Sequence, residues 1–186
     1  MIEDFVETRS GLKVNVQNPA VDAFDIKDIA YALSNTCRFN GHCAGFYSVA
    51  EHSVAVALRL PRNLRLAGLL HDATEAYLGD VPSPIKQFLP DYKEMEHVFT
   101  VAIGKKFDVD LFDPAIKEAD VDALFTEAHF LIPSQGKDWA YFQGPKKFEV
   151  DHRLKPVCLP PQAAFQLFMG CFYDLQEKDT RIVLPA

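Results

Sequence analysis

The chain has 186 residues, of which 48% are hydrophobic, and a formal net charge of −7. This length suits one compact domain, because domains usually hold about 100–200 residues. The acidic balance argues against broad binding to duplex nucleic acid, which depends on Lys and Arg that neutralise phosphates. No stretch approaches the roughly 20 apolar residues of a membrane span, which argues against a membrane protein. The start of the chain lacks the pattern of a signal peptide, so we expect its four cysteines to be free thiols.

The first 20 residues predict a small β appendage. β-branched residues flank Arg9-Ser10-Gly11 on both sides, which is typical of a short hairpin of two strands. Asn18-Pro19 then ends this hairpin as a turn.

Helical patterns dominate the rest of the chain. Asp25 is the expected N-cap of a first helix, and Ser48 is the expected N-cap of a second, which Pro61 ends. A third helix is predicted over residues 62–78, closed by Gly79 and followed by a rigid turn at 80–84. Further helices are expected near residues 92–106, 114–131 and 162–176, with a long loop excursion at 133–161. The sequence therefore predicts that residues 1–186 form a single all-α domain with a β-hairpin.

Chemistry-bearing side chains gather around one histidine–aspartate pair. His71 and Asp72 lie inside an apolar run, where burying them is costly unless both are satisfied, and a divalent metal would satisfy both. Glu75 is expected on the same helix face about one turn later, and Asp80 follows the end of that helix.

Further ligands must come from other helices. His52 lies in an apolar helical stretch, as a metal at a seam between helices requires. Asp120 and Glu127 share a face of the predicted helix at 114–131, whereas Asp122 points about 200° away from Asp120. Only one of the two aspartates can therefore join a shared site, and the spacing alone leaves open which one. No HExxH motif occurs, which disfavours a zinc protease.

These motifs, in this order, resemble the HD-domain metal-dependent phosphohydrolases, and in particular the bacterial 5′-deoxynucleotidases and the phage-type dATP triphosphohydrolases. The resemblance spans about residues 29–127 and rests on YSVAEHS, LLHDATEAYLGDVPSPIK and KEAD. It implies an HD-domain helical bundle with one divalent metal (Mn, Co, Zn, Ni, Fe or Mg). The ligands that it implies are His52, His71, Asp72 and Asp120.

The resemblance also implies roles for neighbouring residues. Glu75 matches the acid that orients or deprotonates the attacking water, and Asp80 matches a second acid beside the sugar and phosphate. Arg38 and Phe39 match an Arg–aromatic pair that binds substrate, although the usual aromatic residue is Trp. Lys86 is a second candidate for phosphate binding, and its alternative interpretation is a surface lysine.

The expected function is hydrolysis of the 5′-phosphate or polyphosphate of 2′-deoxynucleotides, with dATP among the candidate substrates. Whether one phosphate or three are removed at once stays open at this point. Two other hypotheses are a non-catalytic HD-type nucleotide-binding regulatory module and a helical interaction protein without metal. The resemblance further implies a homo-oligomer in the cytoplasm, or in the host cytoplasm if the chain is phage-encoded. Phe165, Phe168 and Phe172 are expected to serve either self-association or the core of the protomer.

Overall fold

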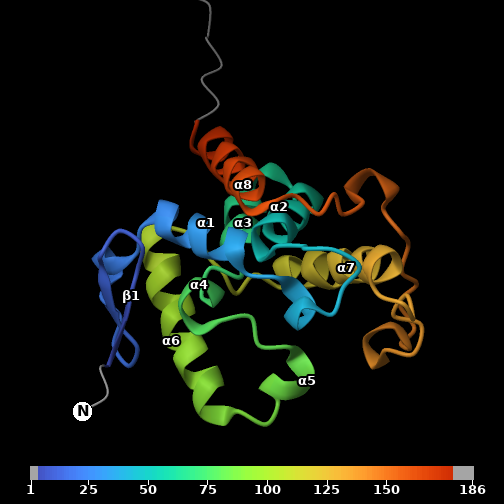
Figure 1. Ribbon diagram of the computed structural model, residues 1–186, viewed down its shortest axis with the longest axis horizontal. Coiled ribbons are helices and arrows are strands. Elements are labelled where there is room, and N and C mark those ends of the chain that lie inside the picture. The colour runs from blue at the N-terminus through green and yellow to red at the C-terminus, as the bar shows by residue number, and fades with distance from the viewer. Residues whose placement is uncertain (1–3, 178–186) are drawn as a thin grey trace, which may run out of the picture.

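The computed structural model describes residues 4–177 and is mostly helical. The predicted hairpin is confirmed: β1 (Phe5–Glu7) and β2 (Lys13–Asn15) pair antiparallel, with Val6 opposite Val14. In Figure 1 this hairpin lies at one edge of the molecule, beside the long helix α6. The hairpin is therefore an appendage to a helical domain.

The helices follow the hairpin in chain order. Short 3-10 turns occur at Val21–Ala23, Arg38–Gly41, Ala140–Phe142 and His152–Leu154. The α-helices are α1 (Ile26–Asn35), α2 (Val49–Arg59), α3 (Arg62–Leu70), α4 (Glu75–Leu78), α5 (Ser83–Lys86), α6 (Pro90–Phe107), α7 (Pro114–Leu131) and α8 (Pro161–Gln176). None of the helices within residues 4–177 combines the length and the apolarity that crossing a lipid bilayer requires.

The two predicted helix caps are confirmed. The Asp25 carboxylate accepts hydrogen bonds from the backbone N–H groups of Lys27 and Asp28 at the start of α1. The Ser48 hydroxyl accepts one from the N–H of Glu51 at the start of α2. Both caps satisfy donors that the first turn of a helix leaves without an intrahelical partner, and so they fix where α1 and α2 begin.

The prediction of one helix over residues 62–78 is wrong, because the chain breaks at His71-Asp72-Ala73-Thr74. α3 ends at Leu70, α4 begins at Glu75, and the four residues between them form turns. The carbonyl of Gly68, which an unbroken helix would pair with the N–H of Asp72, accepts a 2.8 Å hydrogen bond from the imidazole of His71 instead. The predicted rigid turn at 80–84 is likewise shorter than expected, because α5 begins at Ser83.

The core forms around α2, which packs against α1, α3, α7 and α8 (Figure 1). The rings of Phe24, Tyr77 and Phe99 pack on one another with centroids 5.3–5.8 Å apart. On α8, Phe168 and Phe172 are buried in the same core. These two side chains are therefore core residues and do not form a surface for self-association.

The close approach of α2 and α3 depends on Gly68. A Cβ at this position would lie 3.2 Å from the Cα of Ala57 and would clash with the side chain of Leu60. Without a side chain at residue 68, the two helices pack backbone to backbone. This packing brings the end of α3, with His71, towards the middle of α2, with His52.

The predicted excursion at 133–161 runs beside α7 and then returns to α8 (Figure 1). Its last part is held by a buried carboxylate that the sequence did not single out. Glu51 on α2 accepts hydrogen bonds from the backbone N–H groups of Val157, Cys158 and Leu159 at 2.6, 3.2 and 2.9 Å. A charged acceptor makes such bonds stronger than neutral ones, so Glu51 fixes this return segment.

Candidate metal centre

Two histidines and two aspartates from separate elements converge at one place. The Nε2 atoms of His52, on α2, and His71, at the end of α3, lie 3.3 Å apart. Oδ2 of Asp72 lies 3.4 Å from the former nitrogen and 3.2 Å from the latter. Oδ1 of Asp120, on α7, lies 3.3 Å and 4.0 Å from the same two nitrogens. As candidate ligands of one ion, His52, His71, Asp72 and Asp120 are called the metal cluster below.

Both imidazoles are held from behind by groups that only accept hydrogen bonds. Nδ1 of His52 lies 2.6 Å from Oε1 of Glu127, and Nδ1 of His71 lies 2.8 Å from the carbonyl oxygen of Gly68. Each Nδ1 must therefore carry the hydrogen. In the neutral form of each ring, the lone pair of Nε2 then points into the cluster, as metal-binding histidines require.

The metal cluster fits a divalent ion. Nitrogen and oxygen ligands at about 2.0–2.2 Å from a metal lie about 2.8–3.6 Å from one another at adjacent positions of tetrahedral or octahedral geometry. The separations of 3.2–4.0 Å within the cluster are close to that range. His52 is completely buried and the other three residues are half-buried, so their lone pairs at these distances repel one another unless a positive charge lies between them.

The electrostatics of His52 favour a positive charge at the same place. Burial lowers the pKa of His52, as does the charge of Arg38. The carboxylates of Glu127, Asp120 and Asp72 outweigh both effects and raise this pKa well above its usual value. A proton or a metal ion can supply the positive charge that these carboxylates favour.

The structure distinguishes the two candidate aspartates of α7. Asp120 turns Oδ1 towards the histidines, and its Oδ2 accepts a 2.7 Å hydrogen bond from Nζ of Lys117. Asp122 instead pairs with Nζ of Lys146 at 2.6 Å, and 43% of its side chain is exposed. Burial raises the pKa of Asp120, but the hydrogen bond and the charge of His52 outweigh this effect. The pKa of Asp120 therefore lies well below its usual value. Of the two aspartates, Asp120 is the one that faces the cluster.

Arg38 lies inside the site, with its guanidinium turned towards carboxylates. Its Nη1 lies 3.5 Å from Oδ2 of Asp72, and its Nε lies 3.3 Å from Oε2 of Glu127. Burial lowers the pKa of Arg38, but the charges of Glu127 and Asp72 raise it above its usual value, so the guanidinium stays charged. Arg38 thereby balances part of the negative charge of the metal cluster.

Glu127 links the back of His52 to two other residues. Burial raises the pKa of Glu127, but the charges of His52 and Arg38 bring it down to about 2, so this carboxyl is ionised. The hydroxyl of Tyr47 donates a further hydrogen bond of 2.9 Å to Oε1 of Glu127. The sequence spacing placed Glu127 on the same helix face as Asp120 but did not predict the contact between Glu127 and His52. The sequence contained no signal for the role of Tyr47.

Glu75 and Asp80 lie in the electrostatic field of the cluster. Glu75 is buried, and its Oε2 has no hydrogen-bond partner among the described residues. Burial raises the pKa of Glu75 well above its usual value, and the charges of Asp72 and Asp80 add to the effect. Burial also raises the pKa of Asp80. The charge of Arg38 lowers this pKa, and the charge of Asp72 raises it. The charge of Asp72 therefore acts on both acids.

Phe39 and Lys86, the two other residues predicted to contact substrate, have different surroundings. Phe39 is half-buried, and its ring centre lies 5.6 Å from Cζ of Arg38. Lys86 is half-buried as well, but its Nζ donates a 2.6 Å hydrogen bond to Glu96. A phosphate would have to compete with that carboxylate for Lys86.

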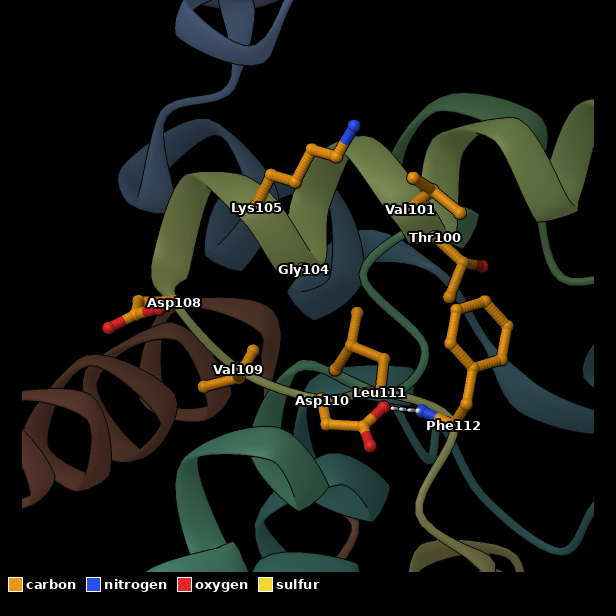
Figure 2. A pocket seen from close by; sticks show the side chains of 9 residues that line it. All are labelled: Thr100, Val101, Gly104, Lys105, Asp108, Val109, Asp110, Leu111 and Phe112. Carbon is orange, nitrogen blue, oxygen red and sulfur yellow. Dashed lines mark hydrogen bonds between the residues drawn. The ribbon is translucent and has the colours of Figure 1, made fainter.

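Two surface grooves lie away from the metal cluster. One, of about 350 Å³, lies between the end of α6 and residues 108–112. Figure 2 shows its lining side chains, with Asp110 accepting a hydrogen bond from the backbone N–H of Phe112. The other, of about 570 Å³, is lined by residues 42–44 and 130–133. Neither groove is lined by a residue of the metal cluster.

The chain is similar in sequence to known proteins. It is 38% identical over 174 residues to the uncharacterized protein YfdR of Escherichia coli K12, and the match covers 93% of this chain and 96% of that protein. The chain belongs to the YfdR family. A second member, the uncharacterized protein RCAP_rcc00048 of Rhodobacter capsulatus, is 36% identical over 134 residues, which are 64% of this chain and 68% of that protein. No protein-family model matches the chain.

Proposed function

We propose that this member of the YfdR family is an HD-type metal-dependent phosphohydrolase that acts on the 5′-phosphate or polyphosphate of 2′-deoxynucleotides. The observation that carries the proposal is the convergence of the metal cluster, with both Nδ1 atoms held from behind. The order of motifs along a mostly helical chain supports it further, because this order is the one on which the resemblance to HD-domain enzymes rests.

The four residues of the metal cluster would hold one divalent ion. Imidazole nitrogen and carboxylate oxygen without thiolate suit Mn, Co, Fe, Ni or Zn, and Mg is the further candidate. When bound, such an ion polarises a phosphoryl oxygen and lowers the pKa of water in contact with it.

Glu75 is the residue best placed to accept a proton from the attacking water. It is buried near Asp72, one of its oxygens has no partner among residues 4–177, and its raised pKa makes its carboxylate a stronger base. Asp80, half-buried in the same field, would help to orient the sugar and phosphate. Arg38 would stabilise negative charge that develops on the phosphate.

The pairing of two candidate lysines with carboxylates favours removal of a single phosphate. A triphosphate needs further positive groups beside the site, and the sequence offers several lysines for this role. Lys86 is paired with Glu96, Lys146 is paired with Asp122, and Lys105 lines the groove of Figure 2. We therefore rank deoxynucleoside monophosphates above dATP as substrates.

A product assay tests the proposal. The chain, purified without chelator, is incubated with dAMP, dADP or dATP and with Mn, Co, Zn or Mg. Released phosphate, pyrophosphate and triphosphate are measured separately. We expect metal-dependent phosphate release, and at least a 100-fold loss (roughly 3 kcal/mol of transition-state stabilisation) in Asp72→Asn. Asp122→Asn is the matched control and should keep full activity, because its side chain faces Lys146.

The same assay separates the competing hypotheses. Tight nucleotide binding without product for any metal would favour the regulatory module. Protein that binds neither metal nor nucleotide would favour the interaction protein. Self-association, which the resemblance implies, is measured separately by light scattering.

A further inference from the structure

An aromatic row connects the excursion after α7 to the neighbourhood of the metal cluster. Phe125 on α7 packs against Phe142 and Phe148, with ring centroids 4.9 and 5.3 Å away. Phe142 in turn stacks on Trp139 with centroids 5.8 Å apart and ring planes at 19°. Gly136 allows this close packing, because a Cβ there would lie 2.8 Å from the ring of Phe142. The three half-buried phenylalanines form an aromatic cluster against which Trp139 packs.

Trp139 lies beside Phe39 at the other end of this row. Their ring centroids are 6.2 Å apart, with the planes tilted by 50°. Both side chains are half-buried, so each ring keeps part of its surface exposed. Trp139 is therefore the member of the row that lies next to the residue predicted to contact substrate.

The backbone around Phe39 is held in an unfavourable conformation. Phe39 and Asn40 have φ values of 56° and 51°, in the left-handed region that a bulky side chain rarely adopts. The two neighbouring side chains at this turn contact different partners. Arg38 enters the site and contacts Asp72, whereas Phe39 lies beside Trp139. Cζ of Arg38 lies 5.6 Å from the ring centre of Phe39, so a ligand whose phosphate lies beside Arg38 would have the aromatic pair next to it.

We infer that Trp139 and Phe39 form a stacking platform for the base of the nucleotide. This inference rests on the proposed function, since it assumes that the phosphate lies near Arg38. A nucleobase is a flat π-system separated from the 5′-phosphate by one sugar. The metal cluster and Arg38 would face the phosphate, and Phe39 and Trp139 would face the base. Stacking of a base on an aromatic ring contributes about 1–3 kcal/mol and tolerates any base. The platform favours purines over pyrimidines, because their larger rings cover more of the indole.

The composition of the chain makes this inference directly measurable. Trp139 is the single tryptophan in the sequence, so the intrinsic tryptophan emission reports on this position alone. The probe is deoxyadenosine, which has the base and sugar but no phosphate to be hydrolysed. We expect it to quench the emission of the full chain in a saturable manner. The matched probe is 2-deoxyribose, which lacks the base and should leave the emission unchanged. Equal effects of the two probes, or none from deoxyadenosine, overturn the inference.

Variants test the two rings separately by equilibrium dialysis of deoxyadenosine. Trp139→Ala should weaken binding by about 5- to 150-fold, the equivalent of one stacking interaction, and Trp139→Phe should restore part of the affinity. Phe39→Ala should weaken binding as well. Phe112→Ala, an exposed aromatic residue in the groove of Figure 2, is the control and should bind normally. Unchanged affinity in a folded Trp139→Ala protein contradicts the inference.

A base-free substrate separates this inference from the proposed function. Release of phosphate from 2-deoxyribose 5-phosphate should be the same in the native chain and in Trp139→Ala, because this compound has no base to stack. If Trp139→Ala lowers that activity as strongly as it lowers the affinity for deoxyadenosine, Trp139 supports the site as a whole and the inference is overturned. If no phosphate is released from any compound, the proposed function fails, while the fluorescence titration still decides whether the base is bound at Trp139.

Discussion

Glu127 lies directly behind His52, with 2.6 Å between Oε1 of its carboxylate and Nδ1 of the imidazole. The contact joins α7 to α2 in the interior of the protein, and both side chains are almost completely buried. It sets which nitrogen of His52 carries the hydrogen and which faces the metal cluster. A carboxylate behind a metal-binding histidine also makes the imidazole a better ligand.

The first prediction follows from this contact. Glu127→Gln keeps the size of the side chain but removes its charge, so we expect the affinity for Mn or Co to fall by about 10- to 100-fold. A competition titration against a coloured chelator measures this affinity without reference to activity. Glu118→Gln, an exposed residue of the same helix, should leave it unchanged. Native affinity in a folded Glu127→Gln protein would show that the carboxylate has no part in metal binding.

A second prediction separates the two aspartates of α7. Asp120→Asn should abolish stoichiometric metal binding, because Oδ1 of Asp120 faces both histidines. Asp122→Asn should retain it, because this side chain pairs with Lys146 outside the cluster. Elemental analysis of the two purified variants provides the comparison. The reverse result would assign the ligand to Asp122.

A third prediction concerns the close packing of α2 and α3. Gly68→Ala should lower the free energy of unfolding by about 1–3 kcal/mol, because the new methyl group meets Ala57 and Leu60. Gly170→Ala is the matched control on α8, where an added Cβ meets nothing within 4 Å. The control should raise the free energy of unfolding by about 0.5–1 kcal/mol, as expected for alanine in a helix. Urea unfolding measures both, and equal effects would contradict the packing argument.

The fourth prediction is a dependence of stability on pH. The hydroxyl of Tyr77 is buried and has no hydrogen-bond partner among the described residues. Tyr77→Phe removes this unsatisfied group while keeping the ring, so it should stabilise the protein by about 1 kcal/mol at neutral pH. Burial, with help from the charges of Asp28 and Asp25, raises the pKa of Tyr77 above its usual value.

The sign of the pH effect follows from this raised pKa. The unfolded chain loses the Tyr77 proton above about pH 10, whereas the folded protein keeps it to higher pH. Loss of the Tyr77 proton from the unfolded chain therefore lowers the free energy of unfolding as the pH rises from about 10 towards the pKa in the folded protein. The advantage of Tyr77→Phe should thus grow between about pH 9 and about pH 11. Urea unfolding at these two pH values tests it, with Tyr173→Phe as an exposed control. A constant difference would contradict the prediction.

Local features of the sequence were sufficient to predict most element boundaries. Asp25 and Ser48 begin their helices as expected, and α7 spans Pro114–Leu131 as predicted, because caps and prolines act within a few residues along the chain. His71 and Asp72 were also singled out from the sequence, since a histidine–aspartate pair inside an apolar run is costly without a partner.

Tertiary contacts decided what spacing left open. The helix predicted over 62–78 breaks at residue 71 because the imidazole of His71 takes the carbonyl of Gly68, a competition that hydrophobic periodicity does not contain. Asp120 rather than Asp122 faces the cluster because the packing of α7 against α2 sets the rotation of the helix. Trp139 and Phe39 are one hundred positions apart in the sequence and meet only in the folded chain. Helix rotation and long-range pairing depend on which surfaces pack together, so the three-dimensional fold alone determines them.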